Sequence, residues 1–446
     1  MHVVIATCGS RGDQVPMLAL ARCLRGRGHR VTLGGPPELR GPALHVGASF
    51  AETAPSMQSL FDAPGAVTGE PRESALERVR SFLRGNLDLQ LRALPPLAAE
   101  ADVLLGSSLI HGGSSVAAAL GKPFLRVHFS PNAFPSGSYA PPGVAASDGA
   151  GTRTTAWADY GRRFDDELLV CLNAYRREQG LPEAPGLFSL GSTEHVLLAC
   201  DPVLAEAPSP KGIHTPRRIT QTGYWYAAQD PTHDDDLAPW LATLPCAPLY
   251  AGFGSVPVAG WPRFVRRLLR VCQELGRPVV LVDKDTGVID RSRGELGESL
   301  LAWAAGHVRA VAEVPHAWLF PRCWAVFHHG GAGTVATAAR AGVPQIVLPQ
   351  ARGSDQRMWL DRLETLGVGM GVVADADGNE SDLHGALLSA ERGHLAMAKR
   401  AKSIQRALSE ADMRARPVDV AADAIEAAVA SHHLGADVER RRHAEP

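Results

Sequence analysis

The chain has 446 residues, which is longer than one hydrophobic core usually supports, so we expect two domains or three. Its 45 basic and 47 acidic residues nearly balance, with a pI of about 6.8, which gives no electrostatic reason to expect nucleic acid or an anionic membrane as a partner. The seven scattered cysteines include no C-x-x-C pair, no apolar run is long enough to span a membrane, and no signal peptide precedes the first strand, so we expect a cytoplasmic protein with reduced thiols.

The N-terminal residues have the pattern of a strand, a turn, a helix and a second strand. Residues 3–6 are a short apolar run of the kind that a parallel sheet buries on both faces, and residues 31–33 are the next such run. Between them lie a polar turn, residues 7–13, and a helical pattern with Pro16 in its first turn. This order predicts the opening of a doubly wound parallel sheet. The turn lacks the G-x-G-x-x-G pattern, so a nicotinamide or flavin cofactor is not supported.

Asp13 ends this turn, and two interpretations of it remain open. Open α/β sheets place their ligands at the carboxyl ends of the strands, where Asp13 would lie. Alternatively, Asp is a common N-cap residue just before a helix that starts with Pro. The two roles are compatible.

The middle of the N-terminal half contains two further apolar runs and one long amphipathic segment. We expect strands at residues 103–105 and 124–128, and a long loop rich in Pro and Gly at residues 131–152. At residues 155–180, aromatic residues and leucines recur every three or four positions, which predicts one helix. Such a stripe most often packs in a core; alternatively, some of its aromatic side chains line a pocket for an apolar small molecule.

A stretch rich in proline and charge, between Pro208 and Pro239, marks a domain boundary. A second alternation of strands and helices follows it, and the residues after 432 are polar and read as a tail. We expect strands from residue 249 to a Gly-Ser turn at 252–255, and at residues 279–282, 308–311, 324–327 and 345–349, with helices at residues 261–275, 354–366, 394–410 and 417–431.

The most informative turn is His328-His329-Gly330-Gly331-Ala332-Gly333-Thr334, between a buried strand and an Ala-rich run suited to a helix. A Gly-rich turn lets a ligand approach the backbone closely. It also aims the unpaired N–H groups of the helix's first turn, with the positive end of the helix dipole, at one point. This arrangement favours a phosphate, and His329 could donate a further hydrogen bond. The alternative is a tight turn whose glycines serve packing alone.

Four motifs carry a family resemblance: residues 7–13 followed by Pro16, residues 252–255, residues 328–334, and Asp355-Gln356. Together they resemble the bacterial natural-product glycosyltransferases of the UDP-glycosyltransferase superfamily, and the vancomycin-group enzymes most of all. The resemblance covers essentially the whole chain, in order and at fitting spacing. It implies the GT-B fold, in which two Rossmann-like, doubly wound parallel-sheet domains face a central cleft. The N-terminal domain would take the acceptor and the C-terminal domain the nucleotide sugar.

The resemblance also implies roles for single residues. Asp13 corresponds to the family's proposed general base, which takes the proton from the acceptor hydroxyl. His328 would pack or orient its neighbour, and Val314 would read the pyrimidine base through its backbone. Asp355 and Gln356 would grip sugar hydroxyls. The residues that would hold the donor diphosphate, the leaving group, are Ser10, Ser255, His329, Gly331, Gly333 and Thr334.

Two features bear on the donor site. Family members use no bound metal, and the chain has neither a D-x-D-type site nor a cluster of His and Cys ligands, so we expect no metal and no cofactor besides the nucleotide sugar. The stretch at residues 349–356 departs from the family, whose usual Pro-x-x-x-Asp-Gln pattern is shorter.

The implied layout is an N-terminal domain at residues 1–215, a linker at 216–240, a C-terminal domain at 241–415, a helix at 416–432 that packs back on the N-terminal domain, and a polar tail at 433–446. The implied function is that of an inverting, metal-independent hexosyltransferase of antibiotic biosynthesis. It would move a hexose or deoxyhexose from a UDP- or dTDP-sugar to a hydroxyl of an apolar small molecule.

Other functions fit the motifs less closely. Sterol or lipid glucosyltransferases share the His-His-Gly-Gly-Ala-Gly-Thr signature and remain an alternative. A nucleotide-sugar epimerase on the same fold would need extra acid/base carboxylates near the sugar. A non-catalytic auxiliary protein should have lost Asp13 or the phosphate-binding turn, and this chain has both.

Overall fold

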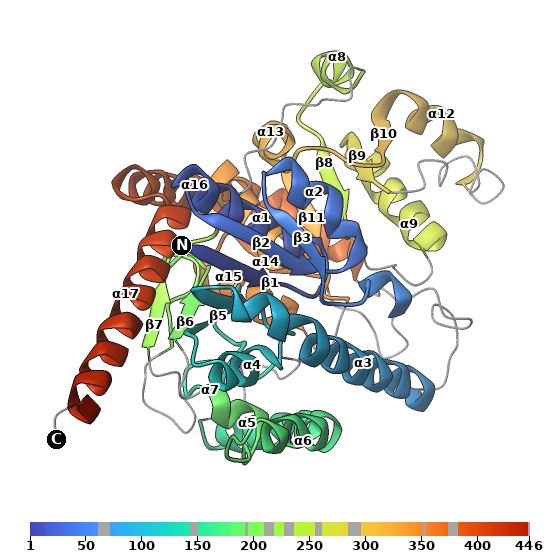
Figure 1. Ribbon diagram of the computed structural model, residues 1–446. Coiled ribbons are helices and arrows are strands. Elements are labelled where there is room, and N and C mark those ends of the chain that lie inside the picture. The colour runs from blue at the N-terminus through green and yellow to red at the C-terminus, as the bar shows by residue number, and fades with distance from the viewer. Residues whose placement is uncertain are drawn as a thin grey trace. The chain divides into compact units, whose positions relative to one another are not determined.

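The computed structural model describes residues 1–60, 72–142, 150–191, 195–208, 218–226, 236–254, 261–283, 296–350, 354–372 and 382–444. The chain divides into two compact units (Figure 1). The first consists of Met1–Ala227 and Arg414–Pro446, and the second of Ala228–Met413. Each unit is an α/β structure on one parallel sheet, which confirms the predicted fold class. Among the helices described, none is both long and apolar enough to cross a membrane.

The sheet of the first unit has seven strands, and all neighbouring strands are parallel. They are β1 (His2–Ala6), β2 (Arg30–Gly35), β3 (Ser49–Glu52), β4 (Val103–Gly106), β5 (Phe124–His128), β6 (His195–Leu198) and β7 (Arg218–Gln221). Their order in space is β3-β2-β1-β4-β5-β6-β7, so the chain first builds outward from β1 and then outward in the other direction from β4. The switch point of this doubly wound sheet therefore lies between β1 and β4.

Burial explains which strands the sequence reveals. Val3, Val4 and Ile5 of β1 are fully buried, as expected for a central strand covered on both faces. The edge strand β7 is different, because it has a single apolar residue, Ile219, and its residues are only partly buried. It lies inside the predicted linker at residues 216–240, which is therefore wrong for residues 218–221. The acidic part of that stretch, residues 227–235, lies outside the described residues.

The first unit also contains helices. They are α1 (Arg11–Gly26), α2 (Arg40–His45), α3 (Arg72–Ala99), α4 (Gly113–Ala119), α5 (Ala150–Phe164), α6 (Val170–Glu178), α7 (Leu187–Gly191) and α17 (Pro417–Ala444), with short turns η1 (Pro37–Leu39) and η2 (Met57–Leu60).

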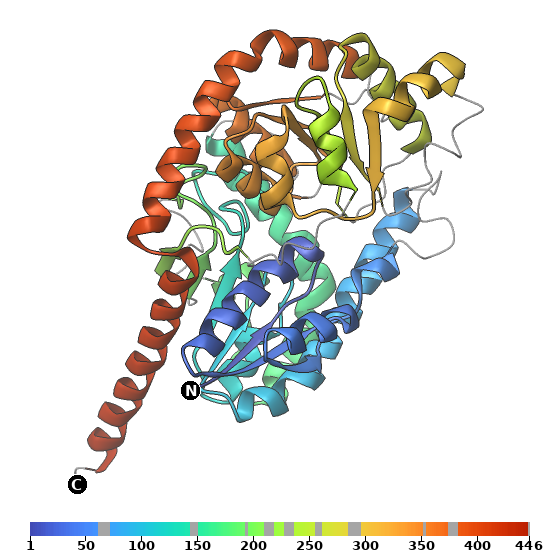
Figure 2. The ribbon, with the colours of Figure 1, turned by 90° about the horizontal axis from the view of Figure 1, so that it is seen from above.

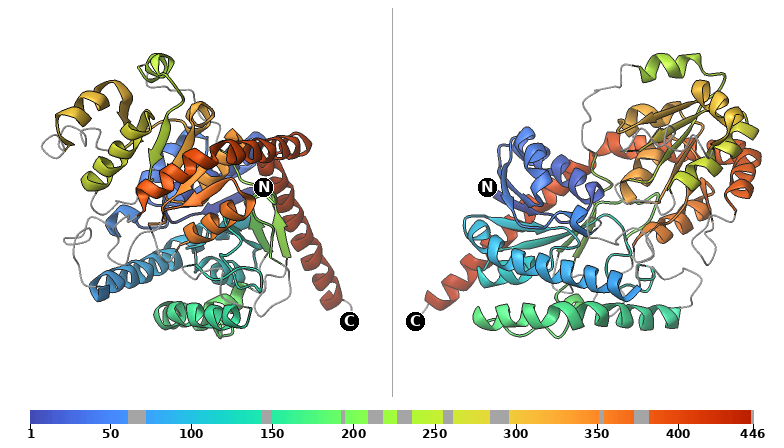
Figure 3. Two further views of the ribbon diagram at one scale, coloured as in Figure 1. Left: turned by 180° about the vertical axis from the view of Figure 1, so that it is seen from behind. Right: turned by 90° about the vertical axis from the view of Figure 1, so that its right-hand side faces the viewer.

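The helix expected at residues 155–180 is α5 and α6, joined by a π-helical stretch, η3 (Asp165–Leu169). This stretch lies beside α3 (Figure 3). Leu168 and Leu172 are fully buried and pack with Leu87 of α3, so this part of the stripe belongs to the core.

The C-terminal helix α17 packs against α1 within the first unit. Arg27, the C-cap residue of α1, donates to Asp419 at 3.1 Å and to Asp423 at 2.6 Å. The helix continues as one rod through residues 433–444, which corrects the predicted polar tail there (Figure 2). Polarity suggested the tail, but Glu and Arg are good helix formers, and a polar sequence can extend a helix that is already nucleated.

The second unit has a six-stranded parallel sheet of order β10-β9-β8-β11-β12-β13. Its strands are β8 (Leu249–Gly252), β9 (Val279–Val282), β10 (Val308–Val311), β11 (Ala325–His328), β12 (Gln345–Val347) and β13 (Gly369–Gly371). Its helices are α8 (Leu237–Thr243), α9 (Trp261–Glu274), α12 (Glu298–His307), α13 (His316–Leu319), α14 (Ala332–Ala341), α15 (Gln356–Leu366) and α16 (Leu383–Arg414), with the short turn η4 (Phe320–Arg322). The switch point here lies between β8 and β11.

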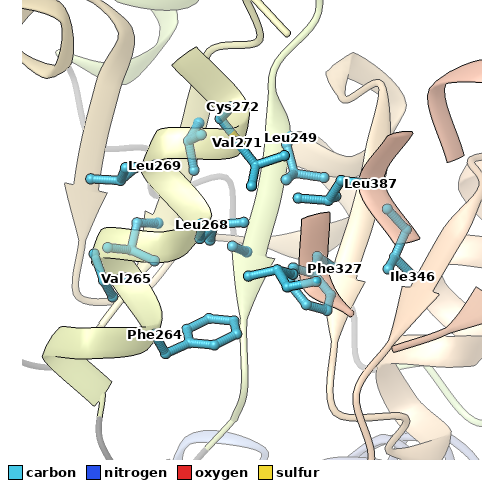
Figure 4. Packing of buried hydrophobic residues seen from close by; sticks show 14 of the residues in the cluster. Leu249, Phe264, Val265, Leu268, Leu269, Val271, Cys272, Phe327, Ile346 and Leu387 are labelled. Carbon is cyan, nitrogen blue, oxygen red and sulfur yellow. The ribbon is translucent and has the colours of Figure 1, made fainter. Parts of the chain in front are cut away.

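Phe327 lies in the core that fixes the end of β11. Its ring centroid is 5.2 Å from that of Phe253 and 5.8 Å from that of Phe264 on α9. Figure 4 shows Phe264 and Leu268 of α9 pointing towards Phe327. Because protein interiors are close-packed, this contact fixes where the chain leaves the sheet after residue 328.

Candidate active site

The strand–turn–helix unit at residues 325–341 forms as predicted. β11 lies between β8 and β12, and α14 begins only four residues after β11 ends. Gly330 has φ = 93°, and a Cβ there would lie 2.9 Å from the Val347 side chain and 3.1 Å from the Gln356 carbonyl oxygen, so the turn requires glycine. Gly331 is the N-cap of α14 and makes no side-chain capping bond. The first N–H groups of α14 therefore point out of the carboxyl edge of the sheet at its switch point.

His328 is a structural residue. It is fully buried, its Nδ1 accepts a hydrogen bond from the Gly330 N–H at 3.1 Å, and its Nε2 lies 3.0 Å from Gln345 Oε1. Because Nδ1 accepts, Nε2 carries the proton and donates it to Gln345. Burial lowers the pKa of His328 to about 3, so the ring is neutral. These two bonds hold the turn in shape, in agreement with the orienting role expected for His328.

His329 lies between two glycines. A Cβ on Gly254 would lie 3.0 Å from its Cε1, and a Cβ on Gly331 would lie 2.5 Å from its Nε2, so both positions must lack a side chain to seat the ring. Burial lowers the pKa of His329 from 6.5 to about 4, and its buried Nδ1 has no hydrogen-bond partner. At neutral pH the ring is thus an uncharged donor and acceptor, held next to the start of α14.

The other residues expected to bind the nucleotide sugar lie at the same edge or outside the described part of the chain. Gly333 and Thr334 are in the first turn of α14 and are half-buried. Val314 follows β10 and its side chain is buried in the core with Tyr250, which leaves the backbone as the part that could meet a ligand. Ser255 lies outside the described residues.

Asp355 and Gln356 already have partners within the protein. Asp355 is the N-cap of α15, and its Oδ2 accepts from the Trp359 indole N–H at 2.9 Å. Gln356 is 5% exposed, and its Oε1 accepts from the Gln350 N–H at 2.7 Å. Asp355 is therefore bonded to α15 itself, and Gln356 to the loop that precedes this helix. Residues 351–353 of that loop lie outside the described residues.

In the first unit, Asp13 lies at the carboxyl edge beside β1, but it is not the N-cap. Ser10 is the N-cap of α1, and Asp13 is the third helical residue of a capping box, in which its Oδ2 accepts from the Ser10 N–H at 2.9 Å. Pro16 is likewise inside the helix, beyond its first turn, because α1 begins at Arg11. A Cβ on Gly9, at φ = 136°, would lie 2.2 Å from Asp13 Oδ2, so glycine makes room for the carboxylate.

The capping box leaves Asp13 half-buried, and Ser10 uses its hydroxyl locally. Ser10 Oγ accepts from the Gly12 N–H at 3.3 Å. The neighbouring Cys8 is buried, and burial together with the Asp13 charge raises the pKa of its thiol to about 12. Cys8 therefore stays protonated and is no nucleophile.

Ser107 is a residue of this edge that sequence analysis missed. It follows β4, and its Oγ accepts from the Thr7 hydroxyl and from the Cys8 N–H, each at 3.2 Å. The pairing of β1 with β4 brings it there, and no local pattern signals it. As for metals, the described residues contain no group of three or more His, Cys, Asp or Glu side chains placed to hold one.

Comparison with known proteins connects this geometry to an activity. Residues 281–427 match the family model for the C-terminal domain of erythromycin biosynthesis protein CIII-like proteins. The chain is 33% identical to vancomycin aglycone glucosyltransferase of Amycolatopsis orientalis, over 83% of this chain and 85% of that one. It is 30% identical to O-mycaminosyltylonolide 6-deoxyallosyltransferase of Streptomyces fradiae, over 92% and 94% of the two chains.

Solved structures share the two-unit architecture. The glycotransferase of kitacinnamycin superposes with a TM-score of 0.67 at 20% identity, covering 96% of this chain and 98% of that one. The spinosyn rhamnosyltransferase SpnG, solved with thymidine diphosphate, superposes with a TM-score of 0.60 at 21% identity, over 93% and 99% of the two chains. These likenesses confirm the expected GT-B fold.

We expect part of the acid sensitivity of this protein to come from His329. In the unfolded chain the imidazole takes up a proton below about pH 6.5, whereas the folded ring stays neutral down to about pH 4. The free energy of unfolding should therefore fall as the pH is lowered from 6.5 towards 4, and His329→Asn should lose less of it over that range. Urea denaturation across this range measures the difference, and an unchanged pH dependence in the variant would contradict a ring that stays neutral in the folded protein.

His328→Asn is the matched comparison. It disrupts two hydrogen bonds, each worth about 1 kcal/mol, whereas the Nδ1 of His329 has no partner to lose. At pH 7.5, His328→Asn should therefore be less stable than His329→Asn.

Proposed function

The chain belongs to the family of natural-product glycosyltransferases that includes the vancomycin-group enzymes, and from that premise we propose its donor, mechanism and acceptor class. It moves a hexose or deoxyhexose from a UDP- or dTDP-sugar to a hydroxyl of an apolar natural product. The anomeric configuration inverts, and neither a metal ion nor a further cofactor takes part.

The start of α14, with His329 beside it, is the feature that best supports a binding site for the diphosphate of the donor. The first N–H groups of this helix have no side-chain cap, and the helix dipole adds positive potential at the same point. A diphosphate gains negative charge as it leaves, so fixed donors there stabilise the transition state more than the ground state. A neutral imidazole can donate one more hydrogen bond to it. The thymidine diphosphate bound to the structurally similar SpnG supports a nucleoside diphosphate as the ligand.

The position of Asp13 supports the proposal that the first unit activates the acceptor hydroxyl. Its carboxylate lies at the carboxyl edge beside the first-unit switch point, and Gly9 leaves it room. Asp13 takes the proton from the acceptor hydroxyl while the oxygen forms a bond to the anomeric carbon. The bond from that carbon to the diphosphate oxygen breaks in the same step, and the diphosphate leaves with the electron pair. One displacement of this kind inverts the anomeric centre.

The donor site is tested by calorimetric titration with UDP and with dTDP, with and without EDTA. We expect one of the two to bind without sensitivity to EDTA, and His329→Ala to weaken its binding by about tenfold or more, the usual effect of one hydrogen bond to a charged group. His384→Ala is the control, because this imidazole on α16 pairs with Glu274 away from the turn. No binding of either nucleotide would overturn the phosphate role of the Gly-rich turn.

The base is tested by Asp13→Asn, with release of the nucleoside diphosphate as the readout and a hydroxylated aromatic compound as the acceptor. The amide oxygen can still accept from the Ser10 N–H, so the helix keeps its cap while the basic carboxylate is lost. We expect kcat to fall by about 10²–10⁴-fold, and the Kd of the nucleotide to stay unchanged. The control is Glu38→Gln, an exposed carboxylate after β2 that accepts from Ser56. A kcat close to that of the control would remove Asp13 from the mechanism.

A further inference from the structure

We propose that His111 is a specificity-determining residue, whose Nε2 forms a hydrogen bond with a second hydroxyl of the acceptor, away from the one that reacts. This inference rests on the proposed function, because it assumes that the first unit takes the acceptor. It goes further by naming the residue that favours acceptors with a second hydroxyl over acceptors without one.

The topology of the first sheet places His111 at the same edge as Asp13. The loop that contains His111 follows β4, which is paired with β1 across the switch point. Ser107 lies in the same loop, and its Oγ accepts hydrogen bonds from the Thr7 hydroxyl and the Cys8 N–H, in the turn that leads to Asp13. Neighbouring strands lie about 4.8 Å apart, so the loops after β1, β4 and β5 cover about 10 Å of this edge, the scale of a small-molecule acceptor.

The Nε2 atom of His111 is buried and has no hydrogen-bond partner. An unsatisfied buried polar group costs free energy, and in a folded protein it calls for an explanation such as an absent ligand. Asn132, which follows β5 at the same edge, provides an independent second case. Its side chain is 2% exposed, and its Oδ1 also has no partner.

Hydrogen bonds from α3 fix the backbone of the loop that contains His111. Asn86 and Gln90 of α3 both donate to the Leu109 carbonyl, at 3.0 and 2.9 Å. Gln90 Oε1 also accepts from the Gly112 N–H at 3.0 Å. These hydrogen bonds hold the backbone on both sides of His111, while the Nε2 atom of its imidazole has no hydrogen-bond partner.

A second imidazole and a buried guanidinium surround this position. His128, the last residue of β5, lies with its Nδ1 2.9 Å from Ser108 Oγ. Arg126 of the same strand donates to the Ile110 carbonyl at 2.7 Å. Burial and the charge of Arg126 lower the pKa of both His111 and His128 to about 3, so both rings are neutral. Neutral imidazoles suit a neutral hydroxyl, which can donate or accept.

Aromatic side chains provide the apolar part of the same site. The ring of His111 lies 6.1 Å from that of Phe164, which in turn lies 5.1 Å from Tyr160. Trp157 and Phe188 continue this group, with the Trp157 ring 5.7 Å from Tyr160. One unpartnered polar atom next to a group of aromatic rings is the composition expected for a site that takes an apolar molecule and fixes its orientation by one hydrogen bond.

The test compares two probes, 2-naphthol and 2-methoxynaphthalene, which differ in whether the oxygen carries a hydrogen. Binding is measured by calorimetry on the full chain for wild type, His111→Phe, His111→Gln and the control His195→Phe, a histidine at the start of β6 that pairs with Thr220. We expect His111→Phe to raise the Kd of 2-naphthol about five- to tenfold and that of 2-methoxynaphthalene less than twofold. His111→Gln should restore most of the preference, and His195→Phe should leave it unchanged.

Equal effects of His111→Phe on both probes, or no effect on either, would make His111 a packing residue and overturn the proposal. So would the failure of 2-naphthol to bind the wild type. Titration of the same preparations with dTDP and UDP separates this failure from that of the proposed function. If the wild type binds a nucleotide but shows no preference for 2-naphthol, only the role of His111 is refuted. If the wild type binds neither nucleotide, the proposed nucleotide-sugar site is refuted.

Discussion

A strand buried on both faces must end at an edge of the sheet, and in the second unit β11 ends in a turn that exposes the first N–H groups of α14. Those N–H groups have no partners inside the helix, so the backbone alone places a group of hydrogen-bond donors at this edge. The surrounding side chains are adapted to that site. Gly330 takes a backbone conformation that favours glycine, and His328 Nδ1 accepts a hydrogen bond from its N–H. Gly254 and Gly331 leave room for the ring of His329.

The first unit uses the same logic with different chemistry. Its switch point lies between β1 and β4, and the turn after β1 carries a carboxylate where the turn of the second unit carries an imidazole. The capping box fixes Asp13 through the Ser10 N–H, so one carboxylate both starts α1 and faces the edge. One edge thus offers a carboxylate and the other fixed hydrogen-bond donors, and the displacement that we propose at an anomeric carbon requires groups of these two kinds.

The sequence predicted the features that depend on neighbouring residues. The buried runs of β1 and β11 and the turn at residues 328–334 are local patterns, and each forms as expected. Features that depend on distant pairing were missed or misplaced. β7 has one apolar residue and is a strand because β6 lies beside it, and Ser107 reaches the Asp13 turn only through the pairing of β1 with β4. The sequence also contains no sign that Gln356 is buried and that its Oε1 accepts a hydrogen bond from the Gln350 N–H; its contact with the sugar stays a prediction.

The crystal structure of the complex with dTDP would test the central claim most directly. The account predicts diphosphate oxygens within hydrogen-bond distance of the N–H groups at the start of α14, residues 332–334, and of the His329 ring. Density for the diphosphate elsewhere, with the start of α14 occupied only by water, would contradict it.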